Sequence, residues 1–435
     1  MRRTSITIAV LIATSVALLS CGSYNSSSSS TQGSTSGLKF RAFVSNPLRP
    51  LSTGGTTPVI EIVDALQDKL PGSAISLLGA SPDPGIMLVS PNKKFTLVFS
   101  ASGNIVTVID NAREALVQSG SGILPSVTLP GFTDSMVIGS DNLTAYAAVP
   151  TAPIVGQSPG GVEVLNLSTA GISATLPVSG ARTIVGSHSG NRILVFGDRV
   201  DTVTVISPSL IGTNADPRTT VQDPAAFDHP VWATFSSDDT TAYILNCGQE
   251  CGGAVASVTV LDLNTNTPGT NVPVDAATIG LLSGNTLYVA GTPPGTACGT
   301  GTAATICGML DVIDLSSMTI TGSAVITDGS HDRMELGSNG QIFIGARRCT
   351  NINIPASGND PGEVRGCLSI FNSSNSSVVV PPDNGDVTGL QPITNRSVVY
   401  VIQQGELRIY DTTTDKLQSN QVDILGQAVD VKLVD

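Results

Sequence analysis

A strand-like segment recurs eight times between residues 59 and 411, and it narrows the folds open to this chain. Each copy alternates apolar with other side chains, ends in Asp, Asn or Ser, and follows the previous copy by 39 to 58 residues. A repeat of about fifty residues built on short strands is typical of β-propellers, whose blades have four strands each. The copies are VIEIVD to Asp64, IVTVID to Asp110, VEVLN to Asn166, VTVIS to Ser207, VTVLD to Asp262, LDVID to Asp314, LSIFN to Asn372 and LRIYD to Asp411.

Companion strands upstream of each copy complete a four-stranded unit. A second apolar strand precedes it, as TAYILN from Thr241 precedes VTVLD, and shorter strands such as 86–89 and 231–235 precede the second strand. The order within a unit is therefore inner, second, third and outer strand. Counting third strands predicts an all-β fold, a single propeller of eight blades. Seven blades is the alternative, if the first unit or the unit ending at Ser207 is an irregular insertion.

The two ends of the repeat region predict how the ring closes. The first strand, from Lys39, is a second strand with no inner strand before it. After an expected outer strand at 421–425, the chain continues into a spare apolar strand at 428–434. We expect this strand to complete the first blade, because sharing a blade between the two ends removes an exposed sheet edge.

The segment before the repeats is typical of a targeting signal. Arg2 and Arg3 precede an apolar stretch that is too short for a comfortable membrane-spanning helix. The stretch ends in Leu-Leu-Ser-Cys at Cys21, which resembles the lipobox of bacterial lipoproteins. That resemblance implies a signal peptide at 1–20, lipid attachment at Cys21 and, because Gly22 follows, export to the outer membrane, on its periplasmic side or at the cell surface.

The stretch at 21–37 separates the predicted lipid anchor from the repeats. Ser, Thr, Gly and Asn dominate it, with five serines in a row. Such a segment has too little apolar surface for burial to offset the entropy of ordering it. We expect it to be a flexible tether, with residues 38–435 forming the propeller domain.

The repeats resemble a known propeller family. YILN from Tyr243 followed by VTVLD, and YVAG from Tyr288 followed by LDVID, are similar to the YVTN-type repeats of bacterial surface proteins. This resemblance covers nearly all of 38–435 but consists of hydrophobic pattern, so it implies fold rather than function. A second resemblance is to the eight-bladed pyrroloquinoline-quinone-like repeats of outer-membrane assembly lipoproteins. Those repeats carry a recurrent Trp, whereas this chain has only Trp232.

Besides Cys21, six cysteines fall in three local pairs. Each pair lies between a second and a third strand, in units five, six and seven. In an exported chain the simplest connectivity is three local disulfides, each closing one loop. A zinc site on the first pair would need a second pair nearby in the sequence, which is lacking. The predicted disulfides are Cys247–Cys251, Cys298–Cys307 and Cys349–Cys367.

The charge of the chain excludes some classes of partner. Its net charge is −13, so it lacks the basic excess that binds nucleic acid or anionic lipid. The predicted membrane contact is through the lipid anchor alone. An envelope protein, a glycan or a small ligand is left as the partner, and neither a cofactor nor a metal ion is predicted.

Few residues suggest catalysis. Ser90-Pro91-Asn92-Lys93 fits a Ser-x-x-Lys string, but it lies in a turn. His229 and His331 lie at the start of inner strands two units apart, and neighbouring units place Asp134 and Arg182 at a similar level. Because inner strands line the central channel, we expect these side chains to ring its mouth. The alternative is that they cap strand starts or bond to loop backbone.

Strand order predicts that the long loops and the mouth residues share one face. In a four-stranded blade, the connection from second to third strand emerges on the same side as the connection to the next blade. The working hypothesis is an envelope scaffold that binds a ligand or protein at this face, through His229, His331, Arg182 and Arg333. The alternative is a lactonase-like or quinoprotein-like propeller enzyme that acts at the channel mouth.

The lipid anchor can be tested by removing its thiol. We expect Cys21→Ser to abolish metabolic labelling with a radioactive fatty acid and to move the protein from the membrane to the soluble fraction, because stable anchoring needs the acyl chains. A Cys21→Ser protein that labels and fractionates like wild type would show that the anchor prediction is wrong.

Overall fold

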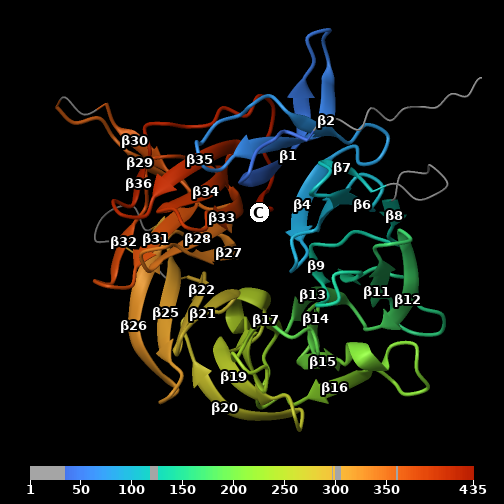
Figure 1. Cartoon of the computed structure of the whole chain (residues 1–435). Helices are drawn as coiled ribbons and strands as arrows, with labels where there is room; N and C mark the ends of the chain where they lie inside the picture. Colours follow the sequence, from blue (N-terminus) through green and yellow to red (C-terminus); the bar gives the residue numbers. More distant parts are fainter. Residues whose placement is uncertain (1–34, 118–125, 296, 299–304, 359–360) are drawn as a thin grey trace, which may run out of the picture.

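Eight sheets stand as blades around a central axis in the computed structural model (Figure 1); each has four strands in order from inner to outer, and one of them pairs with a fifth strand. This confirms the predicted all-β, eight-bladed propeller, and the seven-bladed alternative is wrong. The predicted signal peptide, Cys21 and most of the tether lie outside the described residues. The structure describes residues 35–117, 126–295, 297–298, 305–358 and 361–435.

Blades two to five follow the chain from inner to outer strand, and each strand pairs antiparallel with the next. In blade two, β8 (Ser126–Thr128) also pairs with β6. The strands are β4 (Pro84–Val89), β5 (Phe95–Ser100), β6 (Ile105–Asp110) and β7 (Ala115–Leu116); β9 (Ser135–Ile138), β10 (Thr144–Val149), β11 (Gly161–Asn166) and β12 (Gly171–Pro177); β13 (Ala181–Gly186), β14 (Ile193–Gly197), β15 (Thr202–Ile206) and β16 (Arg218–Gln222); and β17 (Pro230–Phe235), β18 (Thr241–Asn246), β19 (Ser257–Asp262) and β20 (Thr267–Pro273).

Blades six to eight have the same order, and two of them carry an extra hairpin between the second and third strands. These hairpins are β23 (Ala297–Cys298) with β24 (Thr305–Ile306), and β29 (Ile352–Ile354) with β30 (Glu363–Arg365). The blade strands are β21 (Ile279–Ser283), β22 (Thr286–Gly291), β25 (Gly308–Asp314) and β26 (Thr319–Ile326); β27 (Ser330–Leu336), β28 (Gln341–Arg347), β31 (Leu368–Asn372) and β32 (Ser377–Val379); and β33 (Val387–Pro392), β34 (Val398–Gln403), β35 (Glu406–Asp411) and β36 (Lys416–Leu417).

The period of two in the strands sends alternate side chains to opposite neighbours. In β10, Ala145 and Ala147 pack against blade two, whereas Tyr146 and Ala148 pack against blade four. The buried apolar residues of the described chain accordingly form eight clusters, one between each pair of adjacent blades. Burial on both faces explains why the strands are apolar at nearly every position.

The polar residue that ends each third strand shapes the turn after it. In the first unit, the Asp64 carboxylate accepts hydrogen bonds from the backbone N–H groups of Leu66 and Gln67. Such Asx turns satisfy backbone donors at the strand end. Ser207 differs, because a 3₁₀ turn, η1 (Pro208–Leu210), follows it and its side chain caps nothing. The same kind of contact is made by Asp110, Asn166, Asp262, Asp314, Asn372 and Asp411.

Blade one is shared between the two ends of the domain. It contains β3 (Ala74–Ser76), β2 (Thr56–Asp64), β1 (Arg41–Pro50) and, as its inner strand, β37 (Val431–Leu433). The strand predicted at 428–434 therefore does close the ring. Figure 1 shows the C-terminus close to the centre of the disc.

An ion-pair cluster fastens this closure. The Arg41 guanidinium contacts Asp435 at 2.6 Å and Glu114 of blade two at 2.8 Å, and the group is almost buried. Deeper in the ring, Asp430 accepts a hydrogen bond from the backbone N–H of Met87 at 2.8 Å. The last residues of the chain thus hold blades one and two together.

The prediction of an outer strand at 421–425 is wrong, because the outer strand of blade eight is the short β36 at Lys416–Leu417. The side chain of Gln421 explains the difference. Its amide oxygen accepts a hydrogen bond from the backbone N–H of Ile409 at 2.9 Å, and its amide nitrogen donates to the Ile409 carbonyl at 3.3 Å. This side chain therefore takes the place beside β35 that a strand backbone would occupy.

Strand directions place the ends of the domain on the face opposite the loops between second and third strands. As a second strand, β1 begins on the face where inner strands end, and β37 as an inner strand ends there too. Asp435 pairs with Arg41 on that face. The other face carries the second-to-third connections and is called here the mouth face.

The cysteine pairs fall on the mouth face, as predicted. Cys247–Cys251 and Cys349–Cys367 are disulfides, with Cα atoms 5.6 and 5.4 Å apart. Cys307 is also disulfide-bonded, but the Cys298 side chain lies outside the described part of the structure, so its pairing with Cys307 stays a prediction. Within the described residues, no helix is both long and apolar enough to span a membrane.

The closing strand can be tested by truncation. Deleting 428–435 removes the inner strand of blade one and exposes apolar partners of the buried residues Val431, Leu433 and Val434. We expect the free energy of unfolding to fall by at least about 4 kcal/mol, since each buried aliphatic side chain contributes roughly 1.5–3 kcal/mol. Urea denaturation measures this loss.

The control for the truncation is a change in an exposed outer strand. Lys416 and Leu417 of β36 are both exposed, so replacing both with Ser should change the free energy of unfolding by less than about 1 kcal/mol. Equal stability of the truncated and full-length proteins would contradict the proposed closure.

Candidate functional site

A cavity of about 790 Å³ opens on the mouth face over blades four and five. It is bounded by the ends of β13, β14 and β17 and by the disulfide-closed 3₁₀ turn η2 (Gly248–Cys251). Its volume is in the range of small-molecule sites. The lining residues are Arg182, Thr183, Phe196, Gly197, Asp198, Arg199, His229, Pro230, Val231, Gln249, Glu250, Cys251, Gly252 and Ser330.

Two of the residues predicted to ring the mouth meet at one side of this cavity. Arg182, on inner strand β13, lies 3.2 Å from the Asp134 carboxylate of the neighbouring blade and 3.9 Å from Asp198. About half of the Arg182 side chain is exposed, so the pair adds little to stability. The guanidinium remains accessible to a ligand.

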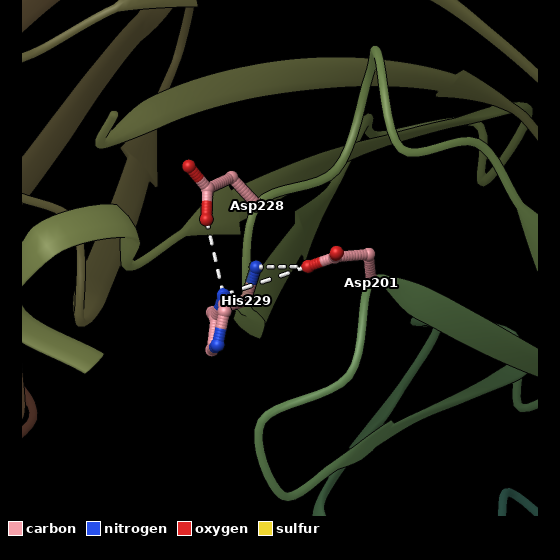
Figure 2. Close-up of side chains that lie close together, drawn as sticks. All are labelled: Asp201, Asp228 and His229. Carbon is pink, nitrogen blue, oxygen red and sulfur yellow. Dashed lines mark hydrogen bonds and ion pairs between the residues drawn. The ribbon is translucent and has the colours of Figure 1, made fainter. Parts of the chain in front are cut away.

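His229 is held by two carboxylates at the other side of the cavity (Figure 2). Its Nδ1 lies 3.0 Å from Asp228 Oδ1 and 3.5 Å from Asp201 Oδ1. Its backbone N–H donates to Asp201 at 3.0 Å, and its carbonyl accepts from Cys247 N–H at 2.9 Å. These contacts fix the backbone of His229 and orient its imidazole ring. The Nε2 atom of the ring has no hydrogen-bond partner among the described residues.

Asp228 is itself fixed by the loop between β18 and β19. Its Oδ2 accepts hydrogen bonds from the backbone N–H groups of Ala254 at 2.8 Å and Val255 at 2.7 Å. Burial alone would raise the pKa of Asp228, but these hydrogen bonds and the contact with His229 outweigh it and lower the pKa. The carboxylate is therefore ionised at neutral pH.

Glu250 of η2 lines the same cavity and has an unusual ionisation. Its Oε2 accepts a hydrogen bond from the backbone N–H of Thr292 in blade six at 2.7 Å. Burial raises the pKa of Glu250 from 4.5 to about 7, and the Thr292 hydrogen bond opposes this only in part. This carboxyl group can therefore both donate and accept a proton near neutral pH.

Arg199 is the second arginine of the cavity. It lies in the connection from β14 to β15, has φ +52° and is exposed. Within the described residues its guanidinium makes no ion pair or hydrogen bond. It is therefore a free cation at the rim.

His331 and Arg333 do not line this cavity, although both were predicted to contribute to binding on the mouth face. His331 is buried inside β27, where Nε2 lies 2.9 Å from the Thr327 carbonyl oxygen, and burial lowers its pKa to about 4. Arg333 donates from Nε to the Thr388 carbonyl of blade eight at 3.1 Å. Neither side chain lines the cavity, although Ser330, the residue before His331, does.

Further charges gather where blades three, seven and eight face the mouth. Arg347 Nε donates to Asp332 Oδ2 at 2.6 Å. Burial would lower the pKa of Arg347, but the carboxylates of Asp332, Asp134 and Asp386 outweigh it and raise the pKa. The Arg347 guanidinium is therefore matched by carboxylates.

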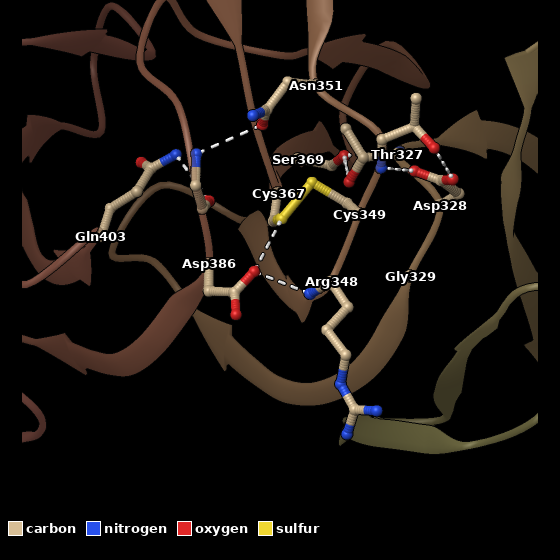
Figure 3. The surroundings of a disulfide bond; sticks show 12 residues. Thr327, Asp328, Gly329, Arg348, Cys349, Asn351, Cys367, Ser369, Asp386 and Gln403 are labelled. Carbon is tan, nitrogen blue, oxygen red and sulfur yellow. Dashed lines mark hydrogen bonds between the residues drawn. A yellow bond between two sulfur atoms is a disulfide. The ribbon is translucent and has the colours of Figure 1, made fainter.

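The long loop of blade seven is tied down close to its disulfide (Figure 3). Asp386 accepts a hydrogen bond from Arg348 N–H at 2.7 Å, and Asp328 accepts one from Thr350 N–H at 2.7 Å. These bonds and the Cys349–Cys367 disulfide fix the base of the β29–β30 hairpin. The loop is thus anchored at its base, and Figure 1 shows β29 and β30 at the outer edge of the disc.

A smaller cavity, of about 290 Å³, lies at the rim of blade four. Its charged groups already satisfy each other, because Arg218 donates to both oxygens of Asp216 at 2.9 Å. It has no histidine and no free cation. The mouth cavity is therefore the better candidate for a functional site.

Sequence reasoning found Arg182, His229 and Asp134 but missed Asp201, Asp228 and Glu250 as parts of one site. A signal for Asp228 was present, since an acidic residue precedes the inner strand in seven of the eight blades. Nothing comparable marks Glu250, which reaches blade six only through the path of η2. The recurring residues are Asp83, Asp134, Asp228, Asp275, Asp328, Asp386 and Asp430.

Comparison with known proteins supports the fold. No protein-family model and no curated protein sequence matches the chain. Among solved structures, dihydro-heme d1 dehydrogenase NirN in complex with DHE is similar over 91% of this chain and 75% of its own, with 12% identity and a TM-score of 0.60. A eukaryotic initiation factor is similar over 91% and 98%, with 10% identity and a TM-score of 0.50. Hydrazine synthase of Kuenenia stuttgartiensis is similar over 68% and 78%, with 15% identity and a TM-score of 0.49. At these identities the likeness to the first two structures is one of fold alone.

The ionisation of Glu250 gives a prediction for stability against pH. A carboxyl group whose pKa rises on folding costs nothing below pH 4.5, and its penalty grows as pH rises to about 7. We expect Glu250→Gln, which keeps the acceptor for Thr292, to match wild type at pH 4. At pH 8 it should be more stable by about 3 kcal/mol. Urea denaturation at both pH values measures the difference.

Glu406→Gln, at an exposed carboxylate on blade eight, is the matched control and should leave the profile of stability against pH unchanged. If the Glu250→Gln and wild-type profiles run parallel from pH 4 to 8, the raised pKa of Glu250 is refuted.

Proposed function

We propose that this chain is an extracytoplasmic lipoprotein whose propeller binds a small anionic ligand in the mouth cavity. The observation that carries the proposal is the cavity itself, which measures about 790 Å³ and lies beside a disulfide-closed turn. Among the described residues, the Arg199 guanidinium and the Nε2 atom of His229 have no hydrogen-bond or ion-pair partner there. A concave site with a few convergent polar groups is the usual form of a small-ligand site.

The charge of the ligand follows from the basic groups of the cavity. Arg182 and Arg199 come from neighbouring positions of blade four, and Arg199 has no carboxylate partner among the described residues. A guanidinium group binds carboxylate or phosphate through two parallel hydrogen bonds. A small organic acid or a phosphorylated compound therefore fits these groups better than a neutral ligand.

The disulfides support the cellular location. Cys247–Cys251 and Cys349–Cys367 favour an oxidising compartment, because disulfides rarely persist in the cytosol. The likeness of the repeats to YVTN-type surface propellers agrees with export. Lipid attachment at Cys21 and sorting to the outer membrane are part of this proposal.

The proposal includes an orientation. A tether that precedes β1 joins the domain on the face where Arg41 pairs with Asp435. The mouth face is the opposite one. A domain anchored at Cys21 would therefore turn its cavity away from the bilayer, toward ligands in the surrounding fluid.

Catalysis at the same site is the second candidate. It is favoured by the pair His229 Nδ1 and Asp228 Oδ1 at 3.0 Å, with Nε2 left free. Such a pair can act as a general base, and Glu250 has a pKa of about 7 that suits a general acid. Chemical conversion of a bound ligand, lost in His229→Asn, would decide for this candidate.

The binding function can be tested by thermal shift. We expect one or more members of a panel of small carboxylates and sugar phosphates to raise the melting temperature. A ligand at one hundred times its Kd stabilises the folded state by about 2.7 kcal/mol. Arg199→Ala should remove most of this shift, because it deletes the free cation of the cavity.

Arg192→Ala is the control, since Arg192 lies outside the cavity and, in the described part of the chain, its guanidinium bonds only the neighbouring Asn191 carbonyl. This variant should keep the full shift. The proposal fails if no compound stabilises the wild type, or if Arg199→Ala responds as the wild type does.

A further inference from the structure

Three potential metal ligands meet at the edge of the mouth cavity: Asp201, Asp228 and His229 (Figure 2). One donor atom from each lies within 4.8 Å of the other two. Asp201 comes from the loop before β15 in blade four, and the other two come from the connection into β17 in blade five. The group therefore bridges two blades.

The spacing of the donors matches that around a small metal ion. Two ligand atoms bound to a tetrahedral zinc ion at about 2.0–2.1 Å lie about 3.4 Å apart. The Nδ1 atom of His229 lies 3.0 Å from Asp228 Oδ1 and 3.5 Å from Asp201 Oδ1. The carboxylate oxygens of Asp201 and Asp228 lie within 4.8 Å of each other, so the two carboxylates would move closer together around a bound ion.

The surrounding backbone orients these donors. The Oδ2 atom of Asp228 accepts hydrogen bonds from the backbone N–H groups of Ala254 and Val255, so that Oδ1 faces the imidazole. The Asp201 carboxylate accepts the backbone N–H of His229. Contacts of this kind to the ligands are typical of metal sites, where they reduce the cost of assembling the ligand set.

Gly253 supplies an independent observation. A Cβ atom at this position would lie 1.8 Å from Asp228 Oδ1 and 2.8 Å from His229 Nδ1. The φ angle of Gly253 is not in the left-handed region, so its backbone does not require glycine. The missing side chain keeps space beside the two donor atoms.

We propose that Asp201, Asp228 and His229 bind a divalent first-row transition-metal ion, with zinc as the best fit. One imidazole and two carboxylates suit zinc, whereas calcium requires six or more oxygen ligands. His229 lines the cavity, so an ion held by these three donors would lie at the cavity edge, with a fourth coordination position left for water or a ligand, as in zinc sites with three protein ligands. Nearby Asp198 and Glu250 add further negative charge.

This site goes beyond the proposed anion binding and is probed with zinc alone. A failure to bind zinc would not change the thermal shift expected with small anions. A failure to bind anions would likewise not change the zinc titration. The two proposals therefore fail separately.

The test is calorimetric titration of the purified, disulfide-bonded protein with ZnCl₂, and with CaCl₂ in parallel. We expect one zinc ion per chain and no calcium binding. Asp201→Asn and His229→Asn each remove a donor, and Asn suits the φ of +56° at position 229. Gly253→Ala keeps all three donors and fills the space between them. Each variant should weaken zinc binding by at least about tenfold.

His188→Ala is the matched control. His188 forms a separate surface pair with Asp239 at 2.8 Å, so its loss should leave the zinc affinity unchanged. Circular dichroism identifies any variant that fails to fold. The remaining folded variants of Asp201, His229 and Gly253 then test the site. No zinc binding by wild type, loss of binding in His188→Ala, or wild-type affinity in all the folded site variants would overturn the proposal.

Discussion

The structure depends on one constraint, which is that a ring of sheets must have no free edge between its first and last blades. β37 meets this constraint by pairing with β1 at three positions, from Ala42 opposite Leu433 to Val44 opposite Val431. On the other side of the shared blade, Arg396 of blade eight donates hydrogen bonds from both terminal guanidinium nitrogens to the Asp68 carboxylate. Every interface between blades is an apolar cluster of a similar kind. The closed arrangement of all eight blades therefore relies on this one join between β37 and β1.

Aspartates at the entry to the inner strands turn the mouth face into a rigid surface. Asp228 and Asp328 each accept backbone N–H groups from the loop after the second strand of their own blade. Asp386 does the same for the loop of the preceding blade. The disulfides add covalent links to loops that are already hydrogen-bonded. Ligand groups on this face are therefore held in place before a ligand arrives, which reduces the entropy lost on binding.

The sequence predicted the fold well because strand alternation and Asx turns are local signals. It predicted the site in part, because a site depends on where loops go. His229 and His331 looked equivalent when aligned at strand starts, yet His229 precedes β17 whereas His331 lies inside β27 and pairs with Ala346. One step along a strand reverses the direction of a side chain, so one histidine faces the cavity and the other is buried. Glu250 escaped notice because only the folded η2 turn brings it to Thr292.

The position of β1 within its blade has a mechanical consequence. Any load that reaches the domain from the N-terminal side passes Ser36, which hydrogen-bonds Glu114 of blade two, before it reaches Arg41 and runs along the axis of β1. This strand is hydrogen-bonded on both edges, to β2 and to β37, so the load shears two ladders at once instead of peeling one strand from an edge. The salt bridge from Arg41 to Asp435 passes part of that load to the other end of the polypeptide.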